Sequence, residues 1–220
     1  MTTDGPTERN PSDSPRQIAG EIAAALVDSA HRLIVGFAGA PGSGKSTLAA
    51  QVCAELGSRA VLVPLDGWHL SAHQTARLGM ADRRGAPETF DAAGFLVLLR
   101  RLRAQSQFGG PTIYAPEYRR EIEEPVAGAV AIDAHVPVVV TEGNYLLLDR
   151  PVWRDVRAQL DLSYLVELDA QERRRRLVAR HRQFGKSPRE AARWVAGSDE
   201  ANARLVAEQT LSPNRVITVG

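Results

Sequence analysis

The sequence predicts an α/β fold of three layers, with a five-stranded parallel sheet at the centre and helices on both of its faces. Short apolar runs of strand length alternate along the chain with stretches of helical length whose apolar residues recur three and four positions apart. The apolar runs are continuous rather than alternating, which is typical of strands buried on both faces. A chain of 220 residues suits one such domain, whereas a second independent domain would be cramped.

The elements are predicted in chain order from this pattern. Residues 1–15 are rich in Pro, Ser, Thr and Asp, so we expect a disordered tail there, followed by a single domain over residues 16–220. Apolar spacing predicts a first helix over residues 18–30, which leads into the first strand at 33–38. Further strands are predicted at 60–64, 136–141, 163–168 and 215–219, and helices at 92–104, 153–159, 170–182 and 188–209, the last with a candidate break at Gly197.

The segment of residues 70–125 is longer and more often interrupted by Gly and Pro than a crossover between two strands requires. Insertions of this kind commonly carry binding sites, because they lie on the surface of a rigid scaffold. We therefore expect residues 70–125 to build a substrate pocket.

Composition excludes several classes of protein. The 27 Lys and Arg residues nearly balance the 26 Asp and Glu residues, so the chain has no strong field to attract nucleic acid or an anionic membrane. No apolar stretch approaches membrane-spanning length, and the amino terminus lacks the regions of an export signal. The single cysteine, Cys53, excludes an intrachain disulfide. We expect a cytoplasmic protein with no nucleic-acid or membrane partner.

A complete phosphate-binding motif, G-x-x-x-x-G-K-[ST], follows the first predicted strand and opens a predicted helix. Its glycines allow backbone N–H groups to face a phosphate, and the helix N-terminus adds partial positive charge. Lys45 is expected to reach the β- and γ-phosphates, and the Ser46 hydroxyl to ligate Mg²⁺. The candidate nucleotide-binding residues here are Gly39, Ala40, Pro41, Gly42, Ser43, Gly44, Lys45, Ser46 and Thr47.

Two carboxylates stand at the ends of predicted strands, where ligands of parallel sheets bind. Asp66 ends the second strand and is the candidate general base for an attacking hydroxyl, the alternative being a helix cap or turn residue before Gly67. Glu142 ends the strand at 136–141 and is a candidate to help hold Mg²⁺ and to line the substrate site.

Taken together, these segments resemble the P-loop kinases of the uridine kinase, phosphoribulokinase and type I pantothenate kinase superfamily, and in particular bacterial nucleoside/nucleotide kinase-like proteins. The resemblance runs from about Arg16 to the carboxyl terminus. Besides the phosphate loop it rests on Leu65-Asp66-Gly67-Trp68-His69, Arg84-Gly85-Ala86-Pro87-Glu88-Thr89-Phe90-Asp91, Tyr114-Ala115-Pro116-Glu117-Tyr118 and Glu142-Gly143-Asn144-Tyr145.

The resemblance implies a P-loop NTPase fold with a helical lid and ATP-dependent phosphorylation of a small-molecule hydroxyl, with Asp66 as base and Mg²⁺ as cofactor. Uridine kinases carry Asp-Ser-Phe-Tyr where this chain has Asp66-Gly67-Trp68-His69, which makes uridine a less favoured substrate. Nucleoside, pantothenate-like and sugar acceptors all stay open. Members of the family often pair as dimers, so a homodimer is also open.

Several further side chains are candidates for the acceptor site. Asp91 either contacts substrate hydroxyls or caps the helix at 92–104. Tyr118 corresponds to a residue that lines the acceptor site in uridine kinases, in a stretch that we expect to be a loop. Arg119, Arg120 and His69 are candidates to bind a phosphate or carboxylate of the acceptor, although a solvated basic turn explains the two arginines at least as well. The candidate substrate-binding residues are Asp66, His69, Arg84, Asp91, Tyr118, Arg119 and Glu142.

Three arginines of the helix at 170–182 lie three and four positions apart, and so share one face. In P-loop kinases a helical lid closes over the triphosphate, and its arginines neutralise the transferring phosphoryl group. We therefore expect a lid over about residues 170–195, with Arg176 as a catalytic residue and Arg173 and Arg180 as nucleotide ligands. The alternative is a charged, solvent-exposed helix face.

A regulatory NTPase without a small-molecule acceptor is the alternative function, since a phosphate loop alone does not identify a kinase. The chain contains neither the Asn-Lys-x-Asp sequence of guanine-binding switches nor the Leu-Ser-Gly-Gly-Gln sequence of transporter ATPases. These absences, together with Lys45, Ser46, Asp66 and Glu142, favour the kinase.

Overall fold

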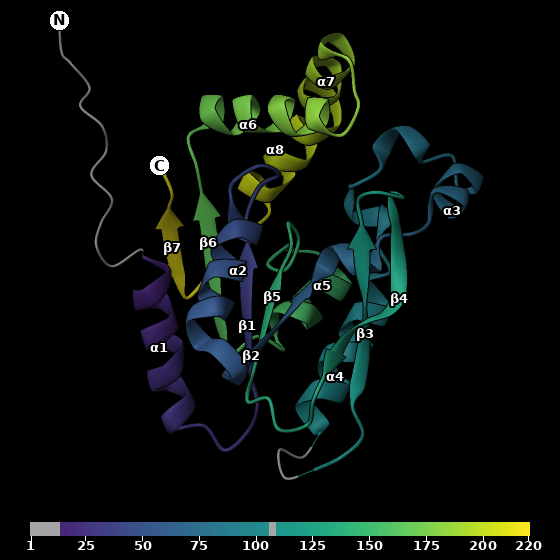
Figure 1. The fold of residues 1–220 in the computed structure, drawn as a ribbon. Helices are drawn as coiled ribbons and strands as arrows, with labels where there is room; N and C mark the ends of the chain where they lie inside the picture. Colours follow the sequence, from purple (N-terminus) through teal and green to yellow (C-terminus); the bar gives the residue numbers. More distant parts are fainter. Residues whose placement is uncertain (1–13, 106–108) are drawn as a thin grey trace, which may run out of the picture.

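A central sheet of five parallel strands organises the protein (Figure 1). The structure, a computed structural model, describes residues 14–105 and 109–220. The expected disordered tail, apart from its last two residues, therefore lies outside the described residues. The strands are β1 (Leu33–Ala38), β2 (Ala60–Pro64), β5 (Val138–Glu142), β6 (Leu162–Glu167) and β7 (Arg215–Thr218). Their order across the sheet is β2-β5-β1-β6-β7.

Helices cover both faces of the sheet, which confirms the predicted three-layer α/β fold. Helices α1 (Pro15–Val27) and α2 (Lys45–Leu56) pack on one face, whereas α4 (Ala92–Ala104) and α5 (Pro151–Arg157) pack on the other (Figure 1). Successive residues of β1 alternate between these layers. Ile34 belongs to the core under α4 and α5, and Val35 to the core under α1 and α2. This burial on both faces explains why the strands are apolar throughout.

Helix α1 starts slightly earlier than predicted. Ser14 is its N-cap, since its side chain accepts a hydrogen bond from the backbone N–H of Gln17, and Pro15 is the first helical residue. A serine followed by a proline is a common helix start, because proline has no N–H to leave unsatisfied. The folded part of the chain thus includes these two residues of the segment that composition assigned to the tail.

The final predicted helix is not broken at Gly197. Helix α7 (Pro188–Trp194) continues through a π-helical turn (Val195–Asp199) into α8 (Glu200–Glu208). A π-turn shifts the backbone hydrogen bonds by one residue and adds a bulge without ending the helix, and such turns often lie at functional sites. The turn places Asp199 in the interior of the protein.

The stretch around Pro116 was predicted to be a loop and is instead a strand. Strands β3 (Ile113–Arg119) and β4 (Glu124–Ile132) form an antiparallel hairpin beside the main sheet. Its register shifts between Ala115 and Glu117, so Pro116 occupies a bulge where no ladder hydrogen bond from its nitrogen is needed. The predicted insertion of 70–125 also contains a short helix, α3 (Ala72–Arg77), and its residues 106–108 lie outside the described residues.

The carboxyl ends of the strands form the edge where the candidate residues gather. Helix α6 (Ala170–Gln183) and α7 lie over this edge, and the β3–β4 hairpin stands to one side of it (Figure 1). Within the described ranges of the chain, no helix has both the length and the apolar character needed to cross a membrane.

Candidate active site

The phosphate loop lies tightly between β6 and α6. A Cβ on Gly39 would lie 2.5 Å from the Val166 carbonyl oxygen, and one on Gly42 would lie 2.7 Å from Leu177 Cγ. Both glycines have positive φ, of 157° and 80°, so a side chain is excluded by space and by backbone conformation. The glycine spacing read from the sequence therefore has a packing cause: α6 lies directly against the loop.

Lys45, at the start of α2, lines the floor of the pocket, whereas Glu142, at the end of β5, is buried next to it and is not among the pocket-lining residues. Both side chains are buried. Burial lowers the pKa of Lys45, and the negative charges of Glu142 and Asp66 oppose that shift. Burial raises the pKa of Glu142 to about 7, with Lys45 and the Ser46 hydroxyl opposing it. The two residues thus form a buried pair whose charges compensate each other beside the phosphate loop.

Asp66 lies in a short 3₁₀ turn, Leu65–Trp68, directly after β2. Its carboxylate lines the same pocket as Lys45 and Ser46 and is about one-third exposed. Arg120 Nη2 lies 3.4 Å from Asp66 Oδ2. The carboxylate is therefore accessible to a substrate and near the phosphate loop, which is the geometry that a general base requires.

His69 contributes a neutral, oriented imidazole next to Asp66. Its Nδ1 lies 2.9 Å from the Asp66 carbonyl oxygen, which can only accept, so Nδ1 carries the proton and donates. Burial lowers the pKa of His69, and the nearby Asp66 opposes the shift. The ring packs against Phe90 and Tyr118, with centroids 4.0 and 5.0 Å away. Nε2 is left as a hydrogen-bond acceptor in the pocket.

The remaining predicted acceptor residues separate into two groups. Arg84 and Tyr118 line the pocket, with the Arg84 guanidinium 5.6 Å from the Tyr118 ring centroid. Asp91 does not line it: the Asp91 carboxylate accepts a hydrogen bond from the Gly94 N–H at 2.8 Å and caps α4. Arg119 is also outside the pocket lining, because its side chain points to Glu117 at 3.0 Å. Arg120, its neighbour on the hairpin, occupies the pocket instead.

Only one of the three predicted lid arginines lines the pocket. Arg173 is buried, donates to the Pro41 carbonyl at 3.2 Å and pairs with Glu200, so it holds the phosphate loop from outside. Arg176 pairs with Glu172 at 2.8 Å and is absent from the pocket lining, which removes the geometric support for its predicted catalytic role. Arg180 does line the pocket. Burial lowers its pKa, and the positive charge of Arg120 adds to that shift.

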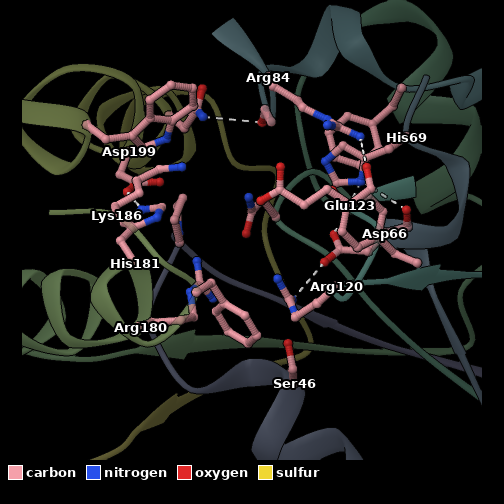
Figure 2. A pocket seen from close by; sticks show the side chains of 18 of the residues that line it. Ser46, Asp66, His69, Arg84, Arg120, Glu123, Arg180, His181, Lys186 and Asp199 are labelled. Atoms are coloured by element: carbon pink, nitrogen blue, oxygen red, sulfur yellow. Dashed lines mark hydrogen bonds and ion pairs between the residues drawn. The ribbon is translucent and has the colours of Figure 1, made fainter. Parts of the chain in front are cut away.

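Further lining residues come from the end of α6, the π-turn and the hairpin tip. Figure 2 shows the side chains of the lid region facing those of the hairpin and the Asp66 turn across the pocket. His181 Nε2 lies 2.8 Å from Asp199 Oδ2, and this contact joins α6 to the π-turn. Asp199 and Asn202 also line the pocket. The lining residues that were not predicted to bind a ligand are Gly85, Phe90, Glu123, Asn144, His181, Phe184, Lys186 and Trp194.

The oxygen donors at the loop fit a magnesium ion bound mainly through nucleotide phosphates. Ser46 and Glu142 supply a hydroxyl and a carboxylate, and Asn144 Oδ1 is a buried oxygen without a hydrogen-bond partner in the described residues. Among these residues no group of three or more His, Cys, Asp or Glu side chains could hold a metal by itself. Mg²⁺ typically keeps several waters and binds through one or two protein oxygens plus phosphates, which agrees with this set.

Comparisons with known proteins point to kinases. No protein-family model matches the chain. A protein of Schizosaccharomyces pombe, provisionally named a uridine kinase, is 31% identical over 203 residues, covering 87% of this chain and 85% of the relative. An ATP-dependent kinase-like protein of Aspergillus versicolor is 36% identical, covering 70% of this chain and 92% of its own.

A solved structure resembles the whole described fold. It is a protein of Silicibacter sp. TM1040, provisionally described as a fructose transport system kinase, and it superposes with a TM-score of 0.82 at 33% identity. The match covers 92% of this chain and 98% of that one.

Proposed function

Because the chain belongs to the P-loop kinases of the uridine kinase, phosphoribulokinase and type I pantothenate kinase superfamily, we propose that it transfers the γ-phosphoryl group of ATP to a hydroxyl of a small metabolite. Nucleosides, pantothenate-like compounds and sugars are the candidate acceptors. The observation that carries the proposal is the position of the Asp66 carboxylate, which lines one pocket with Lys45 and Ser46. The name of the Aspergillus versicolor relative supports ATP as the donor.

Asp66 acts as the general base. It accepts the proton of the acceptor hydroxyl while the hydroxyl oxygen forms a bond to the γ-phosphorus and the bond from that phosphorus to the β,γ-bridging oxygen breaks. ADP leaves with the electron pair of the broken bond. The neutral His69 Nε2 accepts a hydrogen bond from another donor of the acceptor and helps to orient it, since Nδ1 is fixed by the Asp66 carbonyl.

Positive charge around the γ-phosphoryl group comes from three residues. Lys45 bridges the β- and γ-phosphates from the floor of the site. Arg120 and Arg180 approach from the hairpin and from α6, and their mutual repulsion is relieved when an anion lies between them. This arrangement stabilises charge that develops in the transition state, which is the main source of acceleration in phosphoryl transfer.

Ser46 and Glu142 would hold Mg²⁺, directly or through water. When bound, the ion neutralises the phosphate oxygens and orients the triphosphate. Its positive charge also favours the ionised form of Glu142, whose pKa burial raises to about 7.

Residues 170–195 serve as the lid, and the hairpin with the rest of residues 70–125 serves as the substrate-binding insertion. The two segments face each other across the pocket (Figure 2), so an approach of α6 and α7 toward the hairpin would exclude water from the transferring group.

An ADP-release assay with MgATP tests the proposal. Acceptors are nucleosides, pantothenate, pentoses, hexoses and polyols, with and without charged substituents. Release should require one acceptor class, and Asp66→Asn should lower kcat by about 10²–10⁴-fold while ATP affinity stays within about twofold. Acceptor-independent release in the wild type, or equal loss of ATP binding and transfer in Asp66→Asn, would contradict the kinase mechanism and favour a regulatory NTPase.

A further inference from the structure

The pocket extends well beyond the residues that a triphosphate requires. Ser46 and Lys45 mark its phosphate end, and Asp66 marks where the acceptor hydroxyl binds. The rest of the acceptor would occupy the space beyond Asp66. The residues that line this space therefore indicate which chemical groups the acceptor carries. This step rests on the proposed kinase function. Arg84 and Glu123 line one wall of this far part, and His181 and Lys186 line the other (Figure 2). Tyr118 packs against Arg84, and Trp194 against Lys186.

Arg84 has hydrogen-bonding capacity that the protein does not use. One terminal nitrogen donates to the Glu123 carbonyl oxygen, and the same nitrogen lies 3.8 Å from the Glu124 carboxylate. Arg84 Nε is buried and has no hydrogen-bond partner among the described residues. A buried N–H without an acceptor is costly in free energy, and a ligand that accepts its hydrogen bond removes that cost.

Lys186 faces Arg84 from the lid side of the pocket. In the described parts of the chain no carboxylate lies within 4.0 Å of its ammonium group. The ammonium nitrogen lies over the Trp194 ring, 5.1 Å from its centroid. Lys186 follows Gly185, whose φ of 93° turns the chain at the end of α6. Lid closure would therefore bring a cation without an ion-pair partner toward the acceptor.

The charge of the pocket is unlike that of the whole chain. The chain has 27 basic and 26 acidic residues. The pocket lining has five basic residues (Lys45, Arg84, Arg120, Arg180 and Lys186) and three acidic residues (Asp66, Glu123 and Asp199). Asp66 faces Arg120 and Asp199 faces His181, so Glu123 is the one lining carboxylate without such a partner in the described residues. With Lys45, Arg120 and Arg180 assigned to the triphosphate, Arg84 and Lys186 remain for the acceptor.

We propose that the acceptor carries an anionic group, a carboxylate or a phosphate, away from the hydroxyl that is phosphorylated, and that Arg84 and Lys186 bind this group from opposite walls of the pocket. A guanidinium and an ammonium that converge on one site are the usual ligands of such groups. A neutral nucleoside or sugar would leave Arg84 Nε without an acceptor and would leave Lys186 without an ion-pair partner among the described residues, whereas Arg84 keeps only its contact with Glu124 at 3.8 Å.

Direct anion binding is the first test. Calorimetry measures the affinity of inorganic phosphate, malonate and neutral glycerol for the protein saturated with Mg²⁺ and a non-hydrolysable ATP analogue, which fills the triphosphate site. At least one of the two anions should bind in the millimolar range or tighter, and glycerol should not. Arg84→Gln and Lys186→Gln should each weaken anion binding about tenfold or more.

Matched variants separate the site from general charge effects. Arg83→Gln removes the same charge one residue earlier, at an exposed position outside the pocket lining, and should change anion affinity less than about twofold. Glu123→Gln should strengthen anion binding, because it removes the opposing carboxylate. An unchanged affinity for the ATP analogue shows that each variant is folded. If neither anion binds the wild type, or if Arg84→Gln behaves like Arg83→Gln, the proposal is wrong.

Turnover separates this inference from the proposed function. ADP release is compared within three acceptor sets: glycerol, D-glycerate and glycerol 3-phosphate; ribose and ribose 5-phosphate; panthenol and pantothenate. A higher kcat/KM for the anionic member supports the inference, and the glycerol set distinguishes carboxylate from phosphate. A neutral member with the higher kcat/KM would overturn the inference and leave the kinase function standing. Anion binding without ADP release for any acceptor would support the anion site and count against the kinase function.

Discussion

Neighbouring side chains of the hairpin have different roles because strand residues alternate between two faces. Arg119, the last residue of β3, points away from the pocket and pairs with Glu117, whereas Arg120, the first residue after the strand, continues the alternation and reaches Asp66. The Arg120 guanidinium also lies 5.9 Å from the Tyr118 ring centroid and 6.0 Å from that of Phe184. It therefore contacts the hairpin and the lid region together.

Arg120→Gln is expected to lower kcat by about 10²-fold or more, because it removes a positive charge from the transferring phosphoryl group. Steady-state kinetics with MgATP and the acceptor measures this effect. Arg119→Gln is the matched control and should retain kcat within about twofold, since it loses an exposed ion pair. Equal losses in the two variants would show that the alternation along β3 does not determine the site.

Glu142 should make the stability of the nucleotide-free protein depend on pH. Its pKa is raised from 4.5 to about 7 in the folded state, so the folded state binds the proton more tightly than the unfolded chain. The stabilisation is present below pH 4.5 and is lost as pH rises to about 7. Its magnitude is on the order of 3 kcal/mol.

Urea unfolding of wild type and Glu142→Gln between pH 4.5 and 8 measures this contribution. As pH rises through this window, the wild type should lose stability that the variant keeps. The free energy of unfolding of the variant should therefore increase relative to that of the wild type. The test is how the stability difference between the two proteins changes with pH. The size of the difference at a single pH is not used, because the variant also removes the carboxylate next to Lys45. Parallel pH profiles for the two proteins would contradict the prediction.

The backbone of the turn after β2 lies in close contact with the backbone of strand β3 in the hairpin. A Cβ on Gly67 would lie 2.8 Å from the Pro116 carbonyl carbon and closer still to its oxygen. Glycine at this position therefore lets β3 approach the turn that carries Asp66. The pattern Asp66-Gly67 thus reflects packing of two elements that are far apart in sequence.

Gly67→Ala is expected to displace the hairpin from Asp66, because neither backbone segment can accommodate the added methyl group. The KM for the acceptor should rise and kcat should fall, by about tenfold or more in kcat/KM, with little change in ATP affinity. Gly20→Ala in α1 is the control: no atom lies within 4 Å of its added Cβ, and alanine favours the helix. An unchanged kcat/KM in Gly67→Ala would show that the hairpin can move without consequence.

The pocket has two walls, which face each other above the carboxyl ends of the parallel strands. One wall is the hairpin with the Asp66 turn, and the other is α6 with α7 and the π-turn (Figure 2). The phosphate loop lies below both and is held from outside by Arg173. Nucleotide binding should therefore stabilise the entire domain against unfolding.

Saturation with Mg²⁺ and a non-hydrolysable ATP analogue at about 100 times its Kd should raise the free energy of unfolding by about 2.7 kcal/mol. For a domain of this size that corresponds to a rise in Tm of several degrees, about 2–4 °C for each kcal/mol. Thermal unfolding measures the shift. Lys45→Ala should lose most of it, whereas Arg83→Gln should keep it, and a full shift in Lys45→Ala would mean that Lys45 does not bind the nucleotide.

The parallel sheet, its flanking helices and the phosphate loop could all be predicted from the amino-acid sequence. Continuous apolar runs, helical spacing and glycine positions report local requirements of backbone and burial, and these do not depend on distant partners. The same local rules misread Pro116 and Gly197. Proline usually ends a strand and glycine often ends a helix, but a bulge and a π-turn accommodate them here.

The polar side chains that share the pocket could not be identified without the three-dimensional packing. Asp91 and Arg119 have the right chemistry for a ligand, yet one caps α4 and the other faces solvent, whereas Arg120 and Lys186 lie inside. A side chain reaches a site only if its Cα–Cβ bond points toward it and its helix or strand passes close to it. Those directions are set by the packing of the hairpin and α6 against segments that are remote in sequence.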